Sequence, residues 1–138
     1  MKRSRGFLLL MSFLAFLTLS VSSCTKEPGE GGTSKIIGKV YVREYSPAFT
    51  YLLGEYWAAD EEVFLIYGDG VTYDERIWTG PDGDFEFPYL RKGKYQIYIY
   101  SDDSTMTAPS GTVAVFRDVE ITKNGETVDV GTINIVKH

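Results

Sequence analysis

The chain has 138 residues, 14% of them aromatic, and its single histidine is His138. Its 19 Asp and Glu outnumber its 14 Lys and Arg, three of which lie in the first five positions. An acidic chain without clustered Lys or Arg is not expected to bind nucleic acid or to spread over an anionic membrane surface. One histidine supplies no histidine metal cluster and no internal general base, and we expect neither a metal nor another cofactor.

Residues 1–23 resemble a secretory signal peptide. Three basic residues precede Phe7–Leu19, an apolar run of 13 residues, which is short of the roughly 18 needed to span a membrane. Val21-Ser22-Ser23-Cys24 then resembles a bacterial lipobox. That resemblance implies cleavage before Cys24 and acylation of this cysteine. The alternative is an ordinary signal peptide followed by a buried free cysteine.

The lipobox resemblance also implies a location in the cell envelope. Cys24 is the only cysteine, so it has no partner for an internal disulfide. Two or more acyl chains anchor a protein stably, whereas a single chain is marginal. We therefore expect a protein tethered to a membrane, with the outer membrane favoured and its periplasmic and surface sides both open.

Beyond the cysteine, the sequence predicts a tether and one domain. Residues 24–34 are rich in Gly and charge, which is typical of a flexible tether. Residues 35–138 show alternating apolar and polar positions and no apolar stripe of helical period. This pattern predicts an all-β domain, a single antiparallel two-sheet sandwich of about seven strands.

The strands can be placed in chain order. The predicted strands are Ile36–Arg43, Val63–Tyr67, Tyr73–Thr79, Phe85–Phe87, Tyr95–Tyr100, Val113–Thr122 and Glu126–Val136. Val63–Tyr67 is continuously apolar, as in a central strand covered on both faces. Asn124-Gly125 predicts a hairpin between the last two strands. Asp102–Thr105 is expected to be a solvated loop.

The last predicted strand changes phase at Gly131. Val128 and Val130 share one face, but Ile133 and Ile135 fall on the opposite parity. A β-bulge at the glycine would bring all four side chains to the core.

The segment Asp82-Gly83-Asp84 places two carboxylates beside a glycine. A calcium loop needs further oxygen ligands and a bidentate glutamate downstream, whereas Phe85-Glu86-Phe87 follows here. Pro81, Asp82 and Gly83 supply a fixed φ, a side-chain acceptor and a residue free to adopt positive φ, as a tight turn requires. We interpret the segment as a turn between strands, with a calcium site as the alternative.

Several of these positions resemble the carboxypeptidase regulatory-like domain. The pattern comprises Ile36-x-Gly38-x-Val40, Val63-x-Leu65 and the stretch from Thr79 to Ile97 that contains Asp82-Gly83-x-Phe85-x-Phe87. The resemblance implies a transthyretin-like β-sandwich, common in secreted and surface proteins of the Bacteroidota, that serves as an accessory or scaffold module. The sequence departs from the family at Glu44–Glu61, where a long aromatic segment replaces a short turn.

Tyr45–Glu61 is the main candidate for a binding surface. It is too apolar for a solvated loop and too irregular for a strand, although a short helical turn at Leu52–Ala59 is an option. It would either bury its rings as a second small core or expose them to sugars or a protein. Tyr98 and Tyr100 should point outward, as surface cover or as an extension of the aromatic surface. The candidate ligand or partner residues are Tyr51, Tyr56, Trp57, Trp78, Tyr98 and Tyr100.

These features favour binding over catalysis. A nucleophilic triad lacks its base, and no spacing singles out two carboxylates for acid–base work. The preferred function is a non-catalytic accessory or scaffold module that binds an envelope protein. One alternative is a carbohydrate-binding lipoprotein that uses Tyr51, Tyr56, Trp57 and Trp78 for a glycan. Another is a pilus-type subunit that exchanges a strand at its edge.

Overall fold

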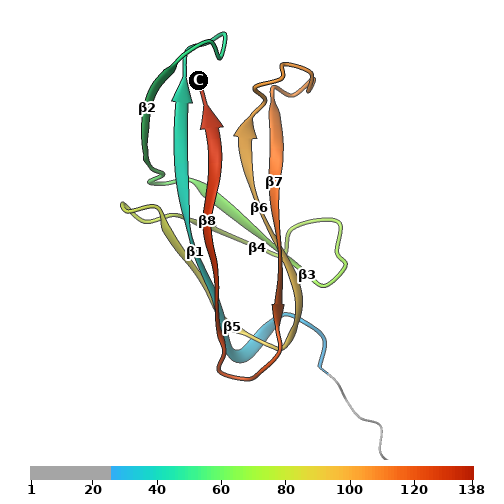
Figure 1. Ribbon diagram of the computed structural model, residues 1–138. Coiled ribbons are helices and arrows are strands. Elements are labelled where there is room, and N and C mark those ends of the chain that lie inside the picture. The colour runs from blue at the N-terminus through green and yellow to red at the C-terminus, as the bar shows by residue number, and fades with distance from the viewer. Residues whose placement is uncertain (1–25) are drawn as a thin grey trace, which may run out of the picture.

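The computed structural model describes residues 26–138, so the predicted signal peptide and Cys24 lie outside the described residues. These residues form eight strands (Figure 1). The strands are β1 (Glu30–Tyr45), β2 (Leu52–Trp57), β3 (Glu62–Tyr67), β4 (Glu75–Trp78), β5 (Asp84–Leu90), β6 (Gly93–Asp102), β7 (Thr112–Ile121) and β8 (Thr127–Lys137). Within this range no helix is long and apolar enough to cross a membrane.

The strands form two four-stranded sheets that pack against each other. In the first sheet β8 pairs with one edge of β1, while β5 and then β2 pair with the other edge. The second sheet has the order β4-β3-β6-β7. The predicted all-β sandwich is confirmed, with eight strands rather than about seven. Every pairing is antiparallel except β1 with β8, which run parallel.

The core comes from alternate positions on strands of both sheets. Val40 and Phe87 of the first sheet and Leu65, Ile97 and Ile99 of the second are each 0% exposed. Because side chains alternate across a strand, the residues between them face outward from the sandwich. The two outer faces are therefore determined once the core positions are known.

The predicted bulge at Gly131 is confirmed. Ile37 pairs with Asp129 and Lys39 with Thr132, so two residues of β8 oppose one of β1. Gly131 has φ +72°, a conformation that suits glycine, and its N–H donates to the Asp129 carboxylate at 2.8 Å. After this phase change Ile133 is fully buried in the core.

The hairpin predicted at Asn124-Gly125 is wrong. This turn carries the chain from β7 in the second sheet to β8 in the first, where β8 pairs in parallel with β1. Ser34 Oγ of β1 donates to the Lys123 carbonyl at 2.9 Å and accepts from the Glu126 N–H at 3.1 Å. The turn is thus bonded to β1 instead of closing a β7–β8 ladder.

The first strand begins at Glu30, before the expected start of the sandwich at Lys35. The Tyr95 hydroxyl accepts from the Gly29 N–H at 2.9 Å and donates to the Arg91 carbonyl at 2.7 Å. The Arg91 N–H in turn donates to the Gly29 carbonyl at 2.9 Å. These bonds hold the C-terminal part of the predicted flexible tether against the sandwich, so the tether is shorter than the sequence indicated.

The interpretation of Asp82-Gly83 as a turn is confirmed. The Gly83 N–H donates to the Gly80 carbonyl at 3.0 Å, and the Gly83 carbonyl accepts from the Val40 N–H at 2.8 Å. Gly83 has φ +73°, which its lack of a Cβ permits. Its backbone therefore ties the β4–β5 turn to the centre of the first sheet.

Asp103 departs from the solvated loop predicted at Asp102–Thr105. It is only 5% exposed, and its carboxylate accepts from the backbone N–H groups of Thr105, Thr107 and Ala108 at 2.9, 2.8 and 2.7 Å. Hydrogen bonds from Thr105 and from this backbone hold the pKa of the carboxyl well below its usual range. Asp103 organises the β6–β7 loop.

Candidate functional site

The aromatic segment after β1 folds back as β2. Tyr41 pairs with Trp57 and Arg43 with Glu55 in an antiparallel ladder. Ser46 closes the hairpin, since its N–H donates to the Tyr51 carbonyl at 3.0 Å. The expectation that this segment is too irregular for a strand is wrong, and the optional helical turn at Leu52–Ala59 does not form. Pairing with the free edge of β1 satisfies the backbone of a segment whose side chains do not alternate clearly.

The predicted binding residues of this hairpin are exposed but do not form one surface. Tyr51, Tyr56 and Trp57 are 64%, 45% and 41% exposed, so they are not buried as a second core. Tyr56 and Trp57 are adjacent on a strand and therefore point to opposite faces. The Trp57 ring lies beside the Tyr41 ring, and Lys39 Nζ is 4.8 Å from the centroid of the Trp57 ring. Tyr56 lies on the side of Val42, and partial burial raises the pKa of its hydroxyl.

A larger aromatic surface covers the outside of the second sheet. Phe64 of β3 is paired with Tyr98 of β6, and Tyr98 with Phe116 of β7, so three rings form a row across three strands. Their neighbours Val63, Leu65 and Ile97 face the core, which places the row on the outer face. We call this surface the outer aromatic face. Its members are Phe64, Tyr73, Trp78, Tyr98, Tyr100 and Phe116.

Five of the six rings of this face pack closely on one another, whereas Trp78 contacts Arg76. Phe64 and Tyr98 stack with centroids 4.7 Å apart and an interplanar angle of 7°. Tyr100 stands nearly perpendicular to both, at 76° to Phe64 and 82° to Tyr98. Tyr73 lies 5.1 Å from Phe64, and Phe116 lies 5.4 Å from Tyr98. Phe64 is only 5% exposed, so β3 is covered on both faces as the sequence predicted, with the outer cover made of surface aromatics.

The rim of the outer aromatic face is open to solvent. Tyr73, Trp78, Tyr100 and Phe116 are 47%, 53%, 45% and 48% exposed. Arg76 lies across from Phe64, with its guanidinium 4.9 Å from the Trp78 ring centroid and 3.1 Å from a Glu62 oxygen. Burial raises the pKa of the Tyr98 hydroxyl at the centre of the face. No other part of the described chain covers these rings.

The sequence prediction identified half of this face. Trp78, Tyr98 and Tyr100 were candidate residues, whereas Phe64, Tyr73 and Phe116 were not. Because side chains alternate across a strand, either Phe64 or its neighbours Val63 and Leu65 must face outward, which is a usable signal. The row itself depends on the cross-strand register, and the sequence of one strand does not specify the residues opposite it.

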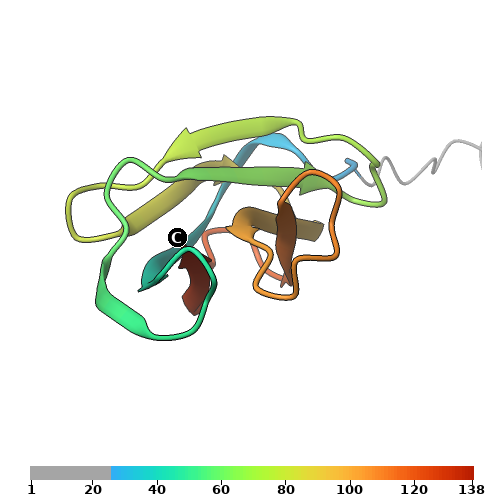
Figure 2. The same ribbon diagram turned by 90° about the horizontal axis from the view of Figure 1, so that it is seen from above.

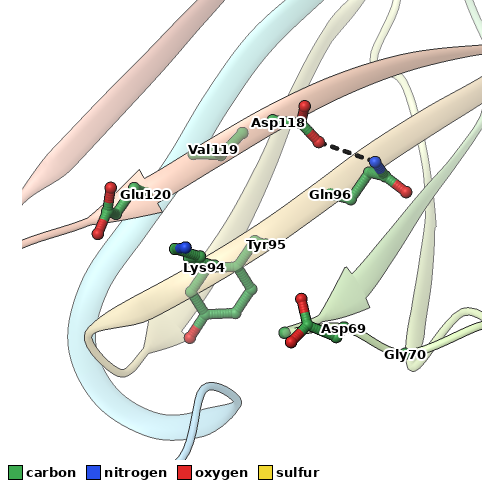
Figure 3. A pocket seen from close by; sticks show the side chains of 9 residues that line it. Asp69, Gly70, Lys94, Tyr95, Gln96, Asp118, Val119 and Glu120 are labelled. Atoms are coloured by element: carbon green, nitrogen blue, oxygen red, sulfur yellow. Dashed lines mark hydrogen bonds between the residues drawn. The ribbon is translucent and has the colours of Figure 1, made fainter.

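A shallow polar groove adjoins the aromatic face on β6 and β7 (Figure 3). Gln96 lies two residues before Tyr98 on the same face and donates to the Asp118 carboxylate at 2.8 Å. Lys94 and Glu120 form the next cross-strand pair, and Asp69 approaches from the β3–β4 loop. The groove offers amide, ammonium and carboxylate groups beside the rings.

Several ionisable groups elsewhere in the described chain have structural partners. The Tyr67 hydroxyl donates to the Glu75 carboxylate, and burial raises the pKa of both groups. His138 Nδ1 lies 2.8 Å from the Asp102 carboxylate, and its ring packs on Phe49. Among residues 26–138, no three of His, Cys, Asp or Glu converge as a metal site would need.

No family model matches the chain, and no curated protein matches it. The resemblance to the carboxypeptidase regulatory-like domain therefore stays a prediction. A solved structure from Pseudomonas aeruginosa, of a protein to which carbohydrate binding has been ascribed, is similar at 12% identity with a TM-score of 0.43. The match covers 79% of this chain and 91% of that one.

Proposed function

We propose that this chain is a non-catalytic binding module, tethered to a membrane of the cell envelope through Cys24, that binds an envelope protein through the outer aromatic face. The observation that carries the proposal is the open rim of that face. Tyr73, Trp78, Tyr100 and Phe116 each leave about half of a large ring surface in water. Contiguous apolar surface of this kind on a small domain marks an interaction site.

The ring geometry favours a protein over a glycan. A sugar ring packs on an exposed aromatic ring face. Here the faces of Phe64 and Tyr98 stack on each other, and Tyr100 packs against both. Trp78 has Arg76 over its ring. Tyrosine, tryptophan and arginine are the residues enriched at the energetic centres of protein interfaces. Rings already fixed by their neighbours lose little freedom on binding, which favours affinity.

The test is crosslinking in the native envelope followed by purification of the chain. We expect one abundant partner, and we expect Tyr100→Ala with Phe116→Ala to reduce its recovery at least tenfold, since both are exposed rings of the rim that contact the central Tyr98 ring. Trp57→Ala with Tyr51→Ala is the matched control, because it removes two exposed rings of the β1–β2 hairpin, outside the outer aromatic face. Equal loss in both double variants, or no partner at all, would contradict the proposal. A ladder of crosslinked copies of the chain would instead support a polymer subunit.

Glycan binding is the second candidate, and the groove at Gln96 and Asp118 favours it. Polar side chains beside an aromatic rim are what a sugar ring with hydroxyl groups requires. In a Trp57→Phe variant, Trp78 is the only tryptophan and reports on the rim. A saccharide that shifts its emission, with the shift abolished in Gln96→Ala, would support this candidate. Emission insensitive to all saccharides tested would exclude it.

A further inference from the structure

Some basic residues of the sandwich are paired with carboxylates and others are not. Of the 14 Lys and Arg, 11 follow the first five residues, and four of these make ion pairs with carboxylates. Lys39 lies over the Trp57 ring. In residues 26–138, the remaining basic side chains form no ion pair with a carboxylate. They are Lys26, Arg91, Lys92, Lys94, Arg117 and Lys123.

All of these except Arg117 belong to one end of the molecule. Lys26 precedes β1, Arg91 and Lys92 form the β5–β6 turn, and Lys123 lies in the β7–β8 turn. These turns and the start of β1 lie together at the end of the sandwich where the chain enters (Figure 1). The β1–β2 hairpin and the β6–β7 loop, with Glu55 and Asp103, lie at the opposite end (Figures 1 and 2). We call the first of these the basic end.

The basic end contains a groove and an unsatisfied donor. Lys26, Arg91 and Lys92 line the groove together with Thr122 and Asn124. Arg91 Nε is buried and has no hydrogen-bond partner among the described residues. A buried donor of a charged group is costly to leave unpaired, so it indicates a partner that the chain itself does not provide. The partner that suits a guanidinium among lysines is an anion with several oxygens, such as phosphate.

Several carboxylates at this end offset part of the positive charge, since Glu27 follows Lys26 in the sequence and Glu30 is the first residue of β1. Glu120 lines the same groove and lies across from Lys94. Glu126 is turned into its own loop, where it accepts from the Thr122 and Lys123 N–H groups at 2.7 and 3.0 Å, and these bonds lower its pKa. The β5–β6 and β7–β8 turns at this end therefore carry three basic residues, Arg91, Lys92 and Lys123, and one carboxylate, Glu126.

We infer that the basic end contacts the phosphate-bearing headgroups of the membrane to which the chain is tethered. The inference rests on the proposed anchor at Cys24, two residues before Lys26. A tether of this length holds the groove within reach of the headgroups, so a modest attraction is enough to orient the domain. The net negative charge of the chain argued against binding to an anionic membrane surface, but composition does not show how charges are distributed along the molecule. The contact would set the direction in which the outer aromatic face is presented.

Lysine footprinting tests this contact with the full chain on vesicles. Acetylation of each lysine is followed by mass spectrometry on neutral vesicles and on vesicles rich in anionic phospholipid. We expect Lys92 and Lys123 to react at least about threefold more slowly on anionic vesicles, as for side chains held at a charged surface. Lys39 and Lys137, outside the basic end, should react equally on both. Equal labelling of Lys92 on the two vesicles would overturn the inference.

Charge-reversal variants and a phosphate control sharpen the result. Lys92→Glu with Lys123→Glu should abolish the protection of Lys26 and Lys94, whereas Lys39→Glu with Arg117→Glu, the same charge change elsewhere, should preserve it. Protection by inorganic phosphate on neutral vesicles, as strong as that on anionic ones, would overturn the membrane contact in favour of a free-ion site. If the mass of the membrane-derived chain shows no acyl groups, the proposed anchor fails. Coupling the Cys24 thiol to a maleimide lipid then still tests the basic end.

Discussion

The two outer faces of the sandwich are each built on four strands but carry different side chains. On the first sheet, Lys35 pairs with Glu86 at 2.9 Å and Arg43 with Glu55 at 2.6 Å, and Tyr41 and Trp57 form an isolated ring pair. On the second sheet, the outward-facing neighbours on adjacent strands are aromatic rings in contact, Phe64 with Tyr98 and Tyr98 with Phe116. Ion pairs in water contribute little to stability, whereas packed rings remove apolar surface from water. The first face is an ordinary solvated surface, whereas the second stabilises the fold and is the surface for which we propose a role in recognition.

Deleting Gly131 should have the largest effect, because it breaks the distinction between core and outer face. Without the bulge, Ile133 and Ile135 would turn to the outside of the first sheet and polar neighbours would turn inward. Exposing two isoleucines costs roughly 3–6 kcal/mol, a large part of the stability of a small domain. Denaturant unfolding measures this. Gly131→Ala, which keeps the bulge, should cost only about 1–2 kcal/mol for a non-glycine residue at positive φ. Similar losses in the two variants would contradict this account of the bulge.

Removing the central ring of the second face should have the next largest effect. Phe64 is buried beneath Tyr73, Tyr98 and Tyr100, so Phe64→Ala should lower the free energy of unfolding by about 3 kcal/mol. Tyr41→Ala removes the matching ring of the first face, which contacts only Trp57 among aromatic residues in the described part of the chain. We expect a loss of about 1 kcal/mol there. Equal losses in thermal or chemical unfolding would show that the two faces do not differ in packing.

High pH should destabilise the packing of Tyr98 on the second face. Burial raises the pKa of Tyr98, so the folded chain binds this proton more tightly than the unfolded chain does. The stabilisation is complete below the ordinary tyrosine pKa of about 10 and is lost as the pH rises through the higher folded value. Tyr98→Phe should therefore lose less stability than the unmodified chain above about pH 10. Identical pH profiles, followed by unfolding and by phenolate absorbance, would contradict this.

The smallest effect is expected from the charged face. Lys35 and Glu86 are 42% and 48% exposed, and a double-mutant cycle on this pair should give a coupling energy below about 0.5 kcal/mol. That value should fall further in high salt. A coupling above about 1 kcal/mol, well outside the range of exposed pairs, would mean that the first face also stabilises the fold.

The fold could be predicted because apolar alternation is a local property of each strand. Ile97 and Ile99 face the core as their spacing indicates, and the phase change at Gly131 was visible in the sequence. Strand partners were harder, because they depend on residues distant in the chain. Asn124-Gly125 has the sequence of a hairpin turn, yet β8 gains more from pairing with β1 over its length. The candidate rings do not form one surface, because Tyr56 and Trp57 are neighbours on a strand and point to opposite faces.

The parallel pairing of β1 and β8 has a mechanical consequence. The proposed tether attaches at the start of β1, the central strand of the first sheet, and β8 pairs along Lys35–Glu44 in the same direction. A partner pulling on the domain would load β1 along its own axis, so its hydrogen bonds to β5 and β8 would be sheared together instead of opening one after another. β1, the strand through which a force on the proposed tether would act, is thus held by hydrogen bonds along both of its edges.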